Sequence, residues 1–149
     1  MVDYDALQRD IDRELREIDD PIRAMTRVVG MLKERVPAYT WVGIYRCAGD
    51  ELLLGPFVGK PSPHTRIPLG RGICGAAATG KTTILVDDVN SDPRYLACSI
   101  ETQAEIVVPI MRNGEVLGEI DIDSDRRGAF GEADRRMLES VAAMLSDKL

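Results

Sequence analysis

The sequence has few of the residues that would place it in several large classes of protein. It has one histidine, one tryptophan and two phenylalanines among 149 residues, and no apolar run approaches the roughly 18 residues that a membrane helix needs. We therefore expect no membrane contact. Positive charge is also scarce, because 19 Lys and Arg residues are outnumbered by 25 Asp and Glu residues, for a net charge of −6. Such a chain has no basic surface to gather phosphates, so nucleic-acid binding is not expected.

Cysteine is equally sparse. The three cysteines, Cys47, Cys74 and Cys98, are odd in number and form no CxxC pair. The amino terminus is acidic and lacks the basic start and apolar stretch of a secretory signal, so we expect a cytoplasmic protein. In a reducing compartment, such thiols are more often free, buried or catalytic than joined in structural disulfides.

The length is typical of one domain, and we expect residues 1–149 to form a single one. Apolar residues at helical spacing predict an N-terminal helix pair over about 4–36 and a C-terminal helix over about 131–147, with a sheet and its loops over about 38–124. This order of elements predicts an α+β fold, in which the helices pack on one face of a mostly antiparallel sheet.

Between the helices, β-branched and alternating apolar residues predict strands, and glycine or proline marks the turns. The clearest hairpin has an Asn113-Gly114 turn between strands at about 105–111 and 116–123. We also predict a hairpin at about 40–54, a long functional loop at about 55–71 with a short edge strand at 66–68, a helix at about 72–79 ended by a left-handed Gly80, a strand at about 82–86 and an irregular stretch at about 87–102.

Strand alternation places Trp41, Gly43 and Tyr45 on one side of the first strand. A glycine between two aromatic residues would leave a notch with backbone as its floor and rings as its walls. The alternative is that these rings are ordinary core residues, because aromatic side chains are common in strands.

The same alternation places several carboxyl groups together. Glu119, Asp121 and Asp123 share one face of their strand, and Glu105 begins the partner strand. This row is either a solvated face or a cluster of acids, in which mutual repulsion raises carboxyl pKa values enough to hold or donate a proton.

Two of the three thiols are candidates for chemistry. Cys74 follows Gly70-Arg71-Gly72 in the first turn of the short helix, where backbone N–H groups favour a thiolate, although most such cysteines are small buried apolar residues. Cys98 lies in a loop near the acids and is the better nucleophile candidate. Cys47, at a strand end, is expected to be structural, and His64 to be an exposed loop residue.

Together, six segments resemble the free methionine-(R)-sulfoxide reductases, which are single-domain GAF proteins. The segments are Trp41-Val42-Gly43-Ile44-Tyr45, Leu54 to Lys60, Gly70 to Gly75, Cys98, Glu105 to Ile110 and Gly118 to Ser124. The resemblance implies a GAF domain that reduces the free amino acid methionine-(R)-sulfoxide to methionine. It also implies a homodimer, thioredoxin or a similar thiol as reductant, and neither a cofactor nor a metal.

The resemblance assigns roles to single residues. Cys98 would attack the sulfoxide sulfur and become a sulfenic acid, which Cys74 would condense to a disulfide. Glu105 and Asp123 would act on the sulfoxide oxygen and, with Asp121, hold the substrate ammonium. The aromatic wall around the substrate methyl group would be formed by Trp41 and Tyr45.

Two positions depart from the family. Many members have a third cysteine where this chain has His64, and we expect an acid where it has Ser99. Three outcomes follow from the missing cysteine: Cys74 resolves Cys98 directly, an external thiol resolves it, or the chain is a non-catalytic GAF sensor that binds a small ligand in the same pocket.

Overall fold

The computed structural model describes residues 1–97 and 99–149. In chain order, its elements are α1 (Tyr4–Arg16), α2 (Pro21–Arg35), β1 (Trp41–Ala48), β2 (Glu51–Val58), β3 (Arg66–Pro68), α3 (Gly72–Gly80), β4 (Ile84–Val86), the 3₁₀ helix η1 (Val89–Ser91), β5 (Ala104–Arg112), β6 (Glu115–Ser124) and α4 (Glu132–Ser146).

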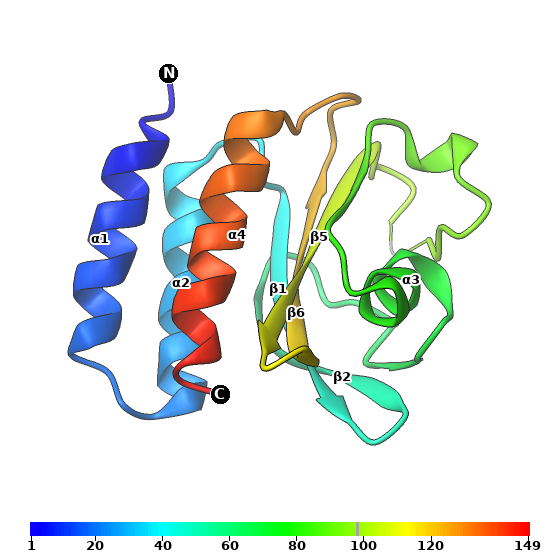
Figure 1. Cartoon of the computed structure of the whole chain (residues 1–149). Helices are drawn as coiled ribbons and strands as arrows, with labels where there is room; N and C mark the ends of the chain where they lie inside the picture. Colours follow the sequence, from blue (N-terminus) through cyan, green and yellow to red (C-terminus); the bar gives the residue numbers. More distant parts are fainter. Residues whose placement is uncertain (98) are drawn as a thin grey trace.

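The six strands form one sheet in the order β3-β2-β1-β6-β5-β4, and every neighbouring pair is antiparallel. The helices α2 and α4 cover one face of this sheet, and α1 packs outside them (Figure 1). The opposite face carries α3 and the long loops (Figure 1). The predicted α+β class, with N- and C-terminal helices on one face, is confirmed.

The first two helices begin at local capping residues. Asp3 and Asp20 cap α1 and α2, accepting hydrogen bonds from the backbone N–H groups of Ala6 at 3.0 Å and Arg23 at 2.9 Å. Pro21 opens α2, where its missing N–H costs nothing. The apolar stripe of α1 is buried against α2 and α4, whereas its charged face remains in water.

Three local predictions were wrong. The residues 55–58 belong to β2, because Phe57 and Val58 pair with Gly43 and Val42 of β1, so the loop is shorter than predicted. The left-handed residue after α3 is Lys81, with φ 54°, rather than Gly80. The irregular stretch after β4 contains η1, which Asp88 caps by accepting a hydrogen bond from the N–H group of Asn90 at 3.2 Å.

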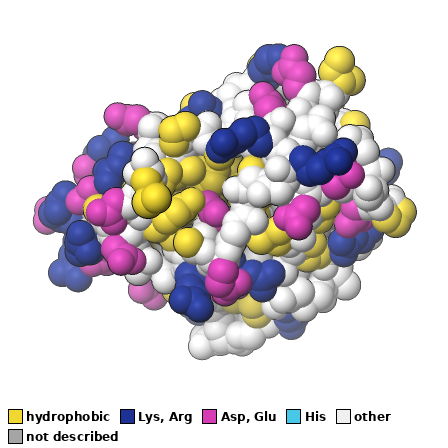
Figure 2. Space-filling model, turned by 90° about the horizontal axis from the view of Figure 1, so that it is seen from above, with side chains coloured by type: hydrophobic (Ala, Val, Ile, Leu, Met, Phe, Trp, Pro, Cys, Tyr) yellow, Lys and Arg dark blue, Asp and Glu magenta, His cyan; other side chains and the backbone are white. Residues whose placement is uncertain are grey.

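The two faces of the sheet differ in chemistry. Val42 and Ile44 of β1, with Ile120 and Ile122 of β6, join the apolar core beneath the helices. Their alternate neighbours on the same strands point to the other face, where the acids lie beneath α3. None of the helices in the described residues combines the length and apolarity of a membrane span. Figure 2 shows basic side chains interspersed with acidic ones, and the face drawn has no extended basic patch.

Candidate active site

The strand register brings the aromatic and acidic residues into rows across the middle of the sheet. In β1, β6 and β5, these rows are Trp41–Asp123–Glu105, Gly43–Asp121–Val107 and Tyr45–Glu119–Pro109. The predicted convergence of the acids is therefore correct, and they lie in the interior rather than on a solvated face. Glu119 is fully buried, and Glu105, Asp121 and Asp123 are each at most 6% exposed.

The notch predicted at Gly43 is filled by the ring of Trp41. A Cβ atom at Gly43 would overlap this indole, and one at Gly59 would lie 2.6 Å from its Cδ1 atom. Phe57 stacks on the other side, with ring centroids 5.8 Å apart, and the indole Nε1 donates a hydrogen bond to the carbonyl of Lys60 at 2.9 Å. Gly43 and Gly59 thus leave the space that the ring occupies, and these contacts hold the indole in place as one wall of the site.

Tyr45 has a different task from Trp41. Its hydroxyl donates a hydrogen bond to the backbone carbonyl of His64 at 2.7 Å, which fastens the loop before β3 to the sheet. The His64 ring in turn places Nε2 3.0 Å from the carbonyl oxygen of Ala97. His64, expected to be an exposed loop residue, is half-buried and connects two segments beside the acids.

Burial raises the pKa of each of the three acids on β6. For Asp123 and Glu119 the rise is large, and the charge of Asp121 adds to it. For Asp121, hydrogen bonds with Glu105 and Cys74 offset part of the rise. Both oxygens of Glu119 and the Oδ1 atoms of Asp121 and Asp123 are buried without a hydrogen-bond partner of normal geometry in the described residues. These groups therefore favour their protonated forms.

The thiol of Cys74 faces the same acids. It lies near the start of α3 and is 5% exposed. Burial raises its pKa well above the usual value, and the charges of Asp121, Glu119 and Glu105 raise it further. The prediction that the helix terminus favours a thiolate here was wrong, because burial beside carboxyl groups outweighs the helix dipole.

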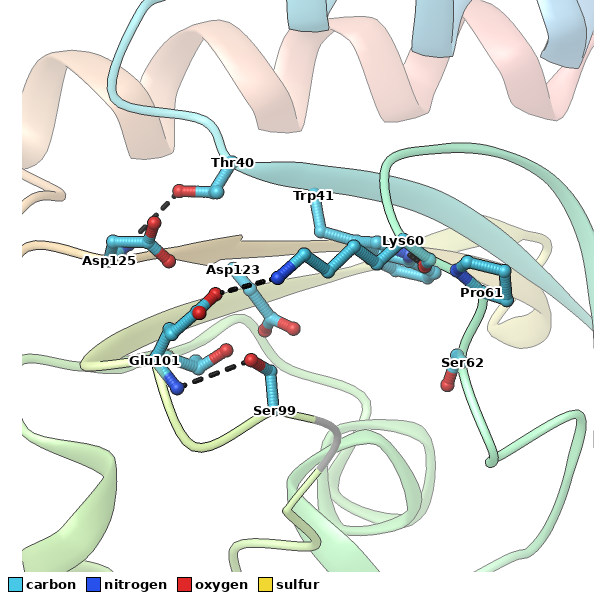
Figure 3. A pocket seen from close by; sticks show the side chains of 10 residues that line it. Thr40, Trp41, Lys60, Pro61, Ser62, Ser99, Glu101, Asp123 and Asp125 are labelled. Atoms are coloured by element: carbon cyan, nitrogen blue, oxygen red, sulfur yellow. Dashed lines mark hydrogen bonds and ion pairs between the residues drawn. The ribbon is translucent and has the colours of Figure 1, made fainter.

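A cavity of about 150 Å³, which we call the outer cavity, opens beside Trp41 and Asp123. Figure 3 shows Lys60 reaching across it to Glu101, with Asp123 beneath the ion pair. The two charged atoms are 2.9 Å apart, and both side chains are mostly exposed. The remaining lining residues are Thr40, Pro61, Ser62, Ser99, Thr102 and Asp125.

A smaller space of about 20 Å³, the inner cavity, lies deeper on the same face. Its polar walls are Cys74, Glu105, Asp121, Tyr45 and His64. Such a volume holds about one water molecule. The outer cavity therefore has room for a small ligand, and the inner cavity does not.

Cys98, the predicted nucleophile, lies outside the described residues. Leu96 lines the inner cavity and Ser99 lines the outer one. Cys47 is half-buried near the end of β1, and burial, followed by the charge of Glu119, raises the pKa of its thiol.

Sequence reasoning missed two residues of this region, Lys60 and Glu101. Glu119 was placed in the row of acids by alternation but was given no role in the site. Lys60 and Glu101 are 41 positions apart, in segments without a regular pattern, so no sequence signal pairs them.

The arrangement combines a fixed indole, a small polar cavity and buried carboxyl groups that hold protons. Such a site can bind a small polar molecule with an apolar end and can protonate an oxygen atom on it.

Comparison with known proteins gives consistent matches. The GAF domain family matches residues 20–149. The free methionine-R-sulfoxide reductase of Escherichia coli is 32% identical over 98% of this chain and 88% of its own length. The enzyme of that name from Saccharomyces cerevisiae is 44% identical over 71% of this chain and 61% of its own length.

Solved structures agree with these matches. The free methionine-R-sulfoxide reductase of Neisseria meningitidis, solved in complex with its substrate, is 35% identical and superimposes with a TM-score of 0.93. The match covers 97% of this chain and 87% of that one.

Proposed function

This chain belongs to the GAF domain family and, within it, to the free methionine-R-sulfoxide reductases, and from that membership we propose that it reduces free methionine-(R)-sulfoxide to methionine. The observation that carries the proposal is the cluster of buried carboxyl groups, which meets an indole wall at the outer cavity. The likeness to the related reductases extends over nearly the whole chain.

We propose Cys98 as the nucleophile. Its thiolate attacks the sulfoxide sulfur and forms a sulfur–sulfur bond while the sulfoxide oxygen takes up a proton. The oxygen then moves to the Cys98 sulfur as the sulfur–sulfur bond and the original S–O bond break, which leaves Cys98 as a sulfenic acid and releases methionine. This assignment is supported by Ser99, the next residue in the chain, which lines the outer cavity.

The carboxyl group of Asp123 is suited to the role of proton donor. It is a buried acid that lines the outer cavity, and Glu105 lies directly opposite it on β5. A carboxylic acid protonating the sulfoxide oxygen makes the sulfur more electrophilic. Asp121 and Glu105 would hold the substrate ammonium, and Trp41 and Tyr45 would enclose its apolar end.

We propose that Cys74 resolves the sulfenic acid. Its sulfur attacks the Cys98 sulfur, a disulfide forms and water leaves. By the family resemblance, His64 stands where many members have a third cysteine. Cys74 is the buried thiol on this face among the described residues. Because its pKa is raised, resolution should be slow until the thiol can lose its proton.

The reductant, assembly and compartment follow from the family resemblance. A dithiol such as thioredoxin would reduce the Cys74–Cys98 disulfide and return both thiols. We propose a homodimer that works in the cytoplasm, and a single domain over 1–149, which is supported by the six strands joining one sheet.

A stereospecific assay tests the function. The purified protein is given the R and S epimers of free methionine sulfoxide, and a peptide containing methionine sulfoxide, with dithiothreitol or with thioredoxin and its reductase. We expect turnover of the free R epimer, none of the peptide, and none in Cys98→Ser.

The matched control is Cys47→Ser, a half-buried thiol outside the proposed mechanism, which should remain active. Turnover in Cys98→Ser would refute the assignment of the nucleophile. Binding of the free R epimer without any reduction would instead identify a sensor domain. Activity with dithiothreitol but not thioredoxin would show that an external thiol resolves the sulfenic acid.

A further inference from the structure

The walls of the inner cavity contain three groups that commonly bind metal ions. They are the thiol sulfur of Cys74 on α3, a carboxyl oxygen of Glu105 on β5 and one of Asp121 on β6. These three atoms all lie within 4.8 Å of one another. All three residues are buried, so packing against neighbouring residues limits the movement of their side chains.

A second observation concerns hydrogen bonding. The Oδ1 atom of Asp121, in a side chain that is 3% exposed, has no hydrogen-bond partner in the described residues. A buried oxygen without a partner is costly, so a ligand that binds this oxygen would be favoured there. The adjoining space of about 20 Å³ has room for one ion or one water molecule.

Charge favours a cation in that space. Glu119, fully buried on the same face, raises the pKa of Cys74 as Asp121 and Glu105 do. The described residues that line the inner cavity include His64 but no lysine or arginine, so the acids there outnumber the basic groups. A bound cation would offset the repulsion among these groups when they ionise.

We propose that the inner cavity binds one divalent transition-metal ion of the zinc type through the sulfur of Cys74 and carboxylate oxygens of Glu105 and Asp121. A water molecule completes a tetrahedral set. One soft thiolate with two carboxylates suits zinc or cobalt, whereas magnesium and calcium prefer oxygen ligands alone. The ligands come from three separate elements, and for that reason the sequence has no metal-binding spacing.

Binding involves no change of oxidation state. The thiol of Cys74 and the carboxyl group of Asp121 give their protons to solvent, sulfur–metal and oxygen–metal bonds form, and the metal loses coordinated water. One consequence rests on the proposed function: a metal-bound Cys74 cannot resolve a sulfenic acid, so the ion would act as a reversible inhibitor of turnover.

Cobalt(II) is the probe for the test. It is titrated into the full-length protein, previously stripped with a chelator and kept reduced with a phosphine, because added thiols would bind the metal themselves. We expect one cobalt ion per chain, a near-ultraviolet thiolate-to-metal band and the visible spectrum of a tetrahedral site, all displaced by zinc.

The variants identify the ligands. Cys74→Ser should abolish the near-ultraviolet band, and Asp121→Asn should weaken binding by about tenfold or more, which is the scale for disturbed metal sites. The matched control is Cys47→Ser, which should keep both the band and the affinity. Thermal melts without metal establish that each variant is folded, and Cys74→Ala replaces Cys74→Ser if the hydroxyl disturbs packing.

Several results would overturn the proposal. They are the absence of a thiolate band in the wild-type protein, a band that persists in folded Cys74→Ser, or a band lost in Cys47→Ser. None of these depends on catalysis. A protein that binds cobalt as expected but reduces no sulfoxide would refute the proposed function alone, and an active protein without the band would refute the metal site alone.

Discussion

The position of Trp41 depends on the absence of a side chain at Gly43, and this dependence gives a sharp prediction for Gly43→Ala. The added methyl group would overlap the indole, with two of the ring carbons 2.6 and 3.0 Å from the new Cβ atom. The ring cannot move aside freely, because Phe57 stacks on it and Gly59 lies against its Cδ1 atom.

The cost has two parts. Overpacking of a well-packed site costs about 1–3 kcal/mol, and loss of the indole hydrogen bond to Lys60 costs about 1 kcal/mol more. We therefore expect Gly43→Ala to lower the free energy of unfolding by about 2–4 kcal/mol. Because domains are stable by about 5–15 kcal/mol, the variant should still fold. It should also bind substrate more weakly, since Trp41 is a wall of the outer cavity.

Urea unfolding followed by tryptophan fluorescence measures the free energy of unfolding and the surroundings of the indole. Trp41 is the single tryptophan of the chain, so its emission reports on this one site, and we expect a red shift in the folded variant. The control is Gly30→Ala in α2, where a Cβ atom would meet nothing within 4 Å. Alanine at a helix interior should stabilise the protein by about 0.5–1 kcal/mol. Unchanged emission and an unchanged urea midpoint in Gly43→Ala would refute the reasoning.

Three further predictions concern stability. Asp134→Ala should lower the free energy of unfolding by about 2–4 kcal/mol in urea, because Asp134 accepts hydrogen bonds from Tyr4 at 2.9 Å and from buried Tyr39 at 2.6 Å; a loss below about 0.5 kcal/mol would contradict this. Burial and Asp134 raise the pKa of Tyr4 to about 12 and raise that of Tyr39 further. Their contribution to stability is therefore complete below the unfolded pKa of about 10 and is lost at higher pH. Ultraviolet absorbance of tyrosinate should thus rise together with unfolding; ionisation of both residues in the folded protein near pH 10 would be evidence against it. Finally, Lys81→Gly should be more stable than Lys81→Ala by about 1 kcal/mol, since Lys81 has φ 54°; equal thermal midpoints would show that the left-handed backbone costs nothing there.

The sequence was sufficient for features that depend on local periodicity. One of these features is the Asn113-Gly114 turn, whose residues have φ values of 53° and 79°. Alternation correctly placed Trp41 on the face opposite the helix-covered core. Each of these features is decided by residues within a few positions of one another.

The errors arose where distant segments decide the outcome. The thiolate expected at Cys74 depended on the helix terminus, whereas its proton is held by burial and by carboxyl groups from β5 and β6. The notch at Gly43 was expected to be open, but the ring of Trp41 fills it. The rotamer of Trp41 is set by contacts with Phe57 and Gly59 and not by β1 alone. Neither packing arrangement has a signature in the sequence around the residue concerned.

The pairing of β1 with β6 joins segments from opposite halves of the chain in the centre of the sheet. The hairpins β1–β2 and β5–β6 can each form early from neighbouring residues, but Trp41 meets Asp123 only after the long intervening segment has closed into a loop. Until that slow event, every carboxyl group of the row remains hydrated and ionised. Competence for chemistry is consequently acquired late in folding, as a property of the completed topology.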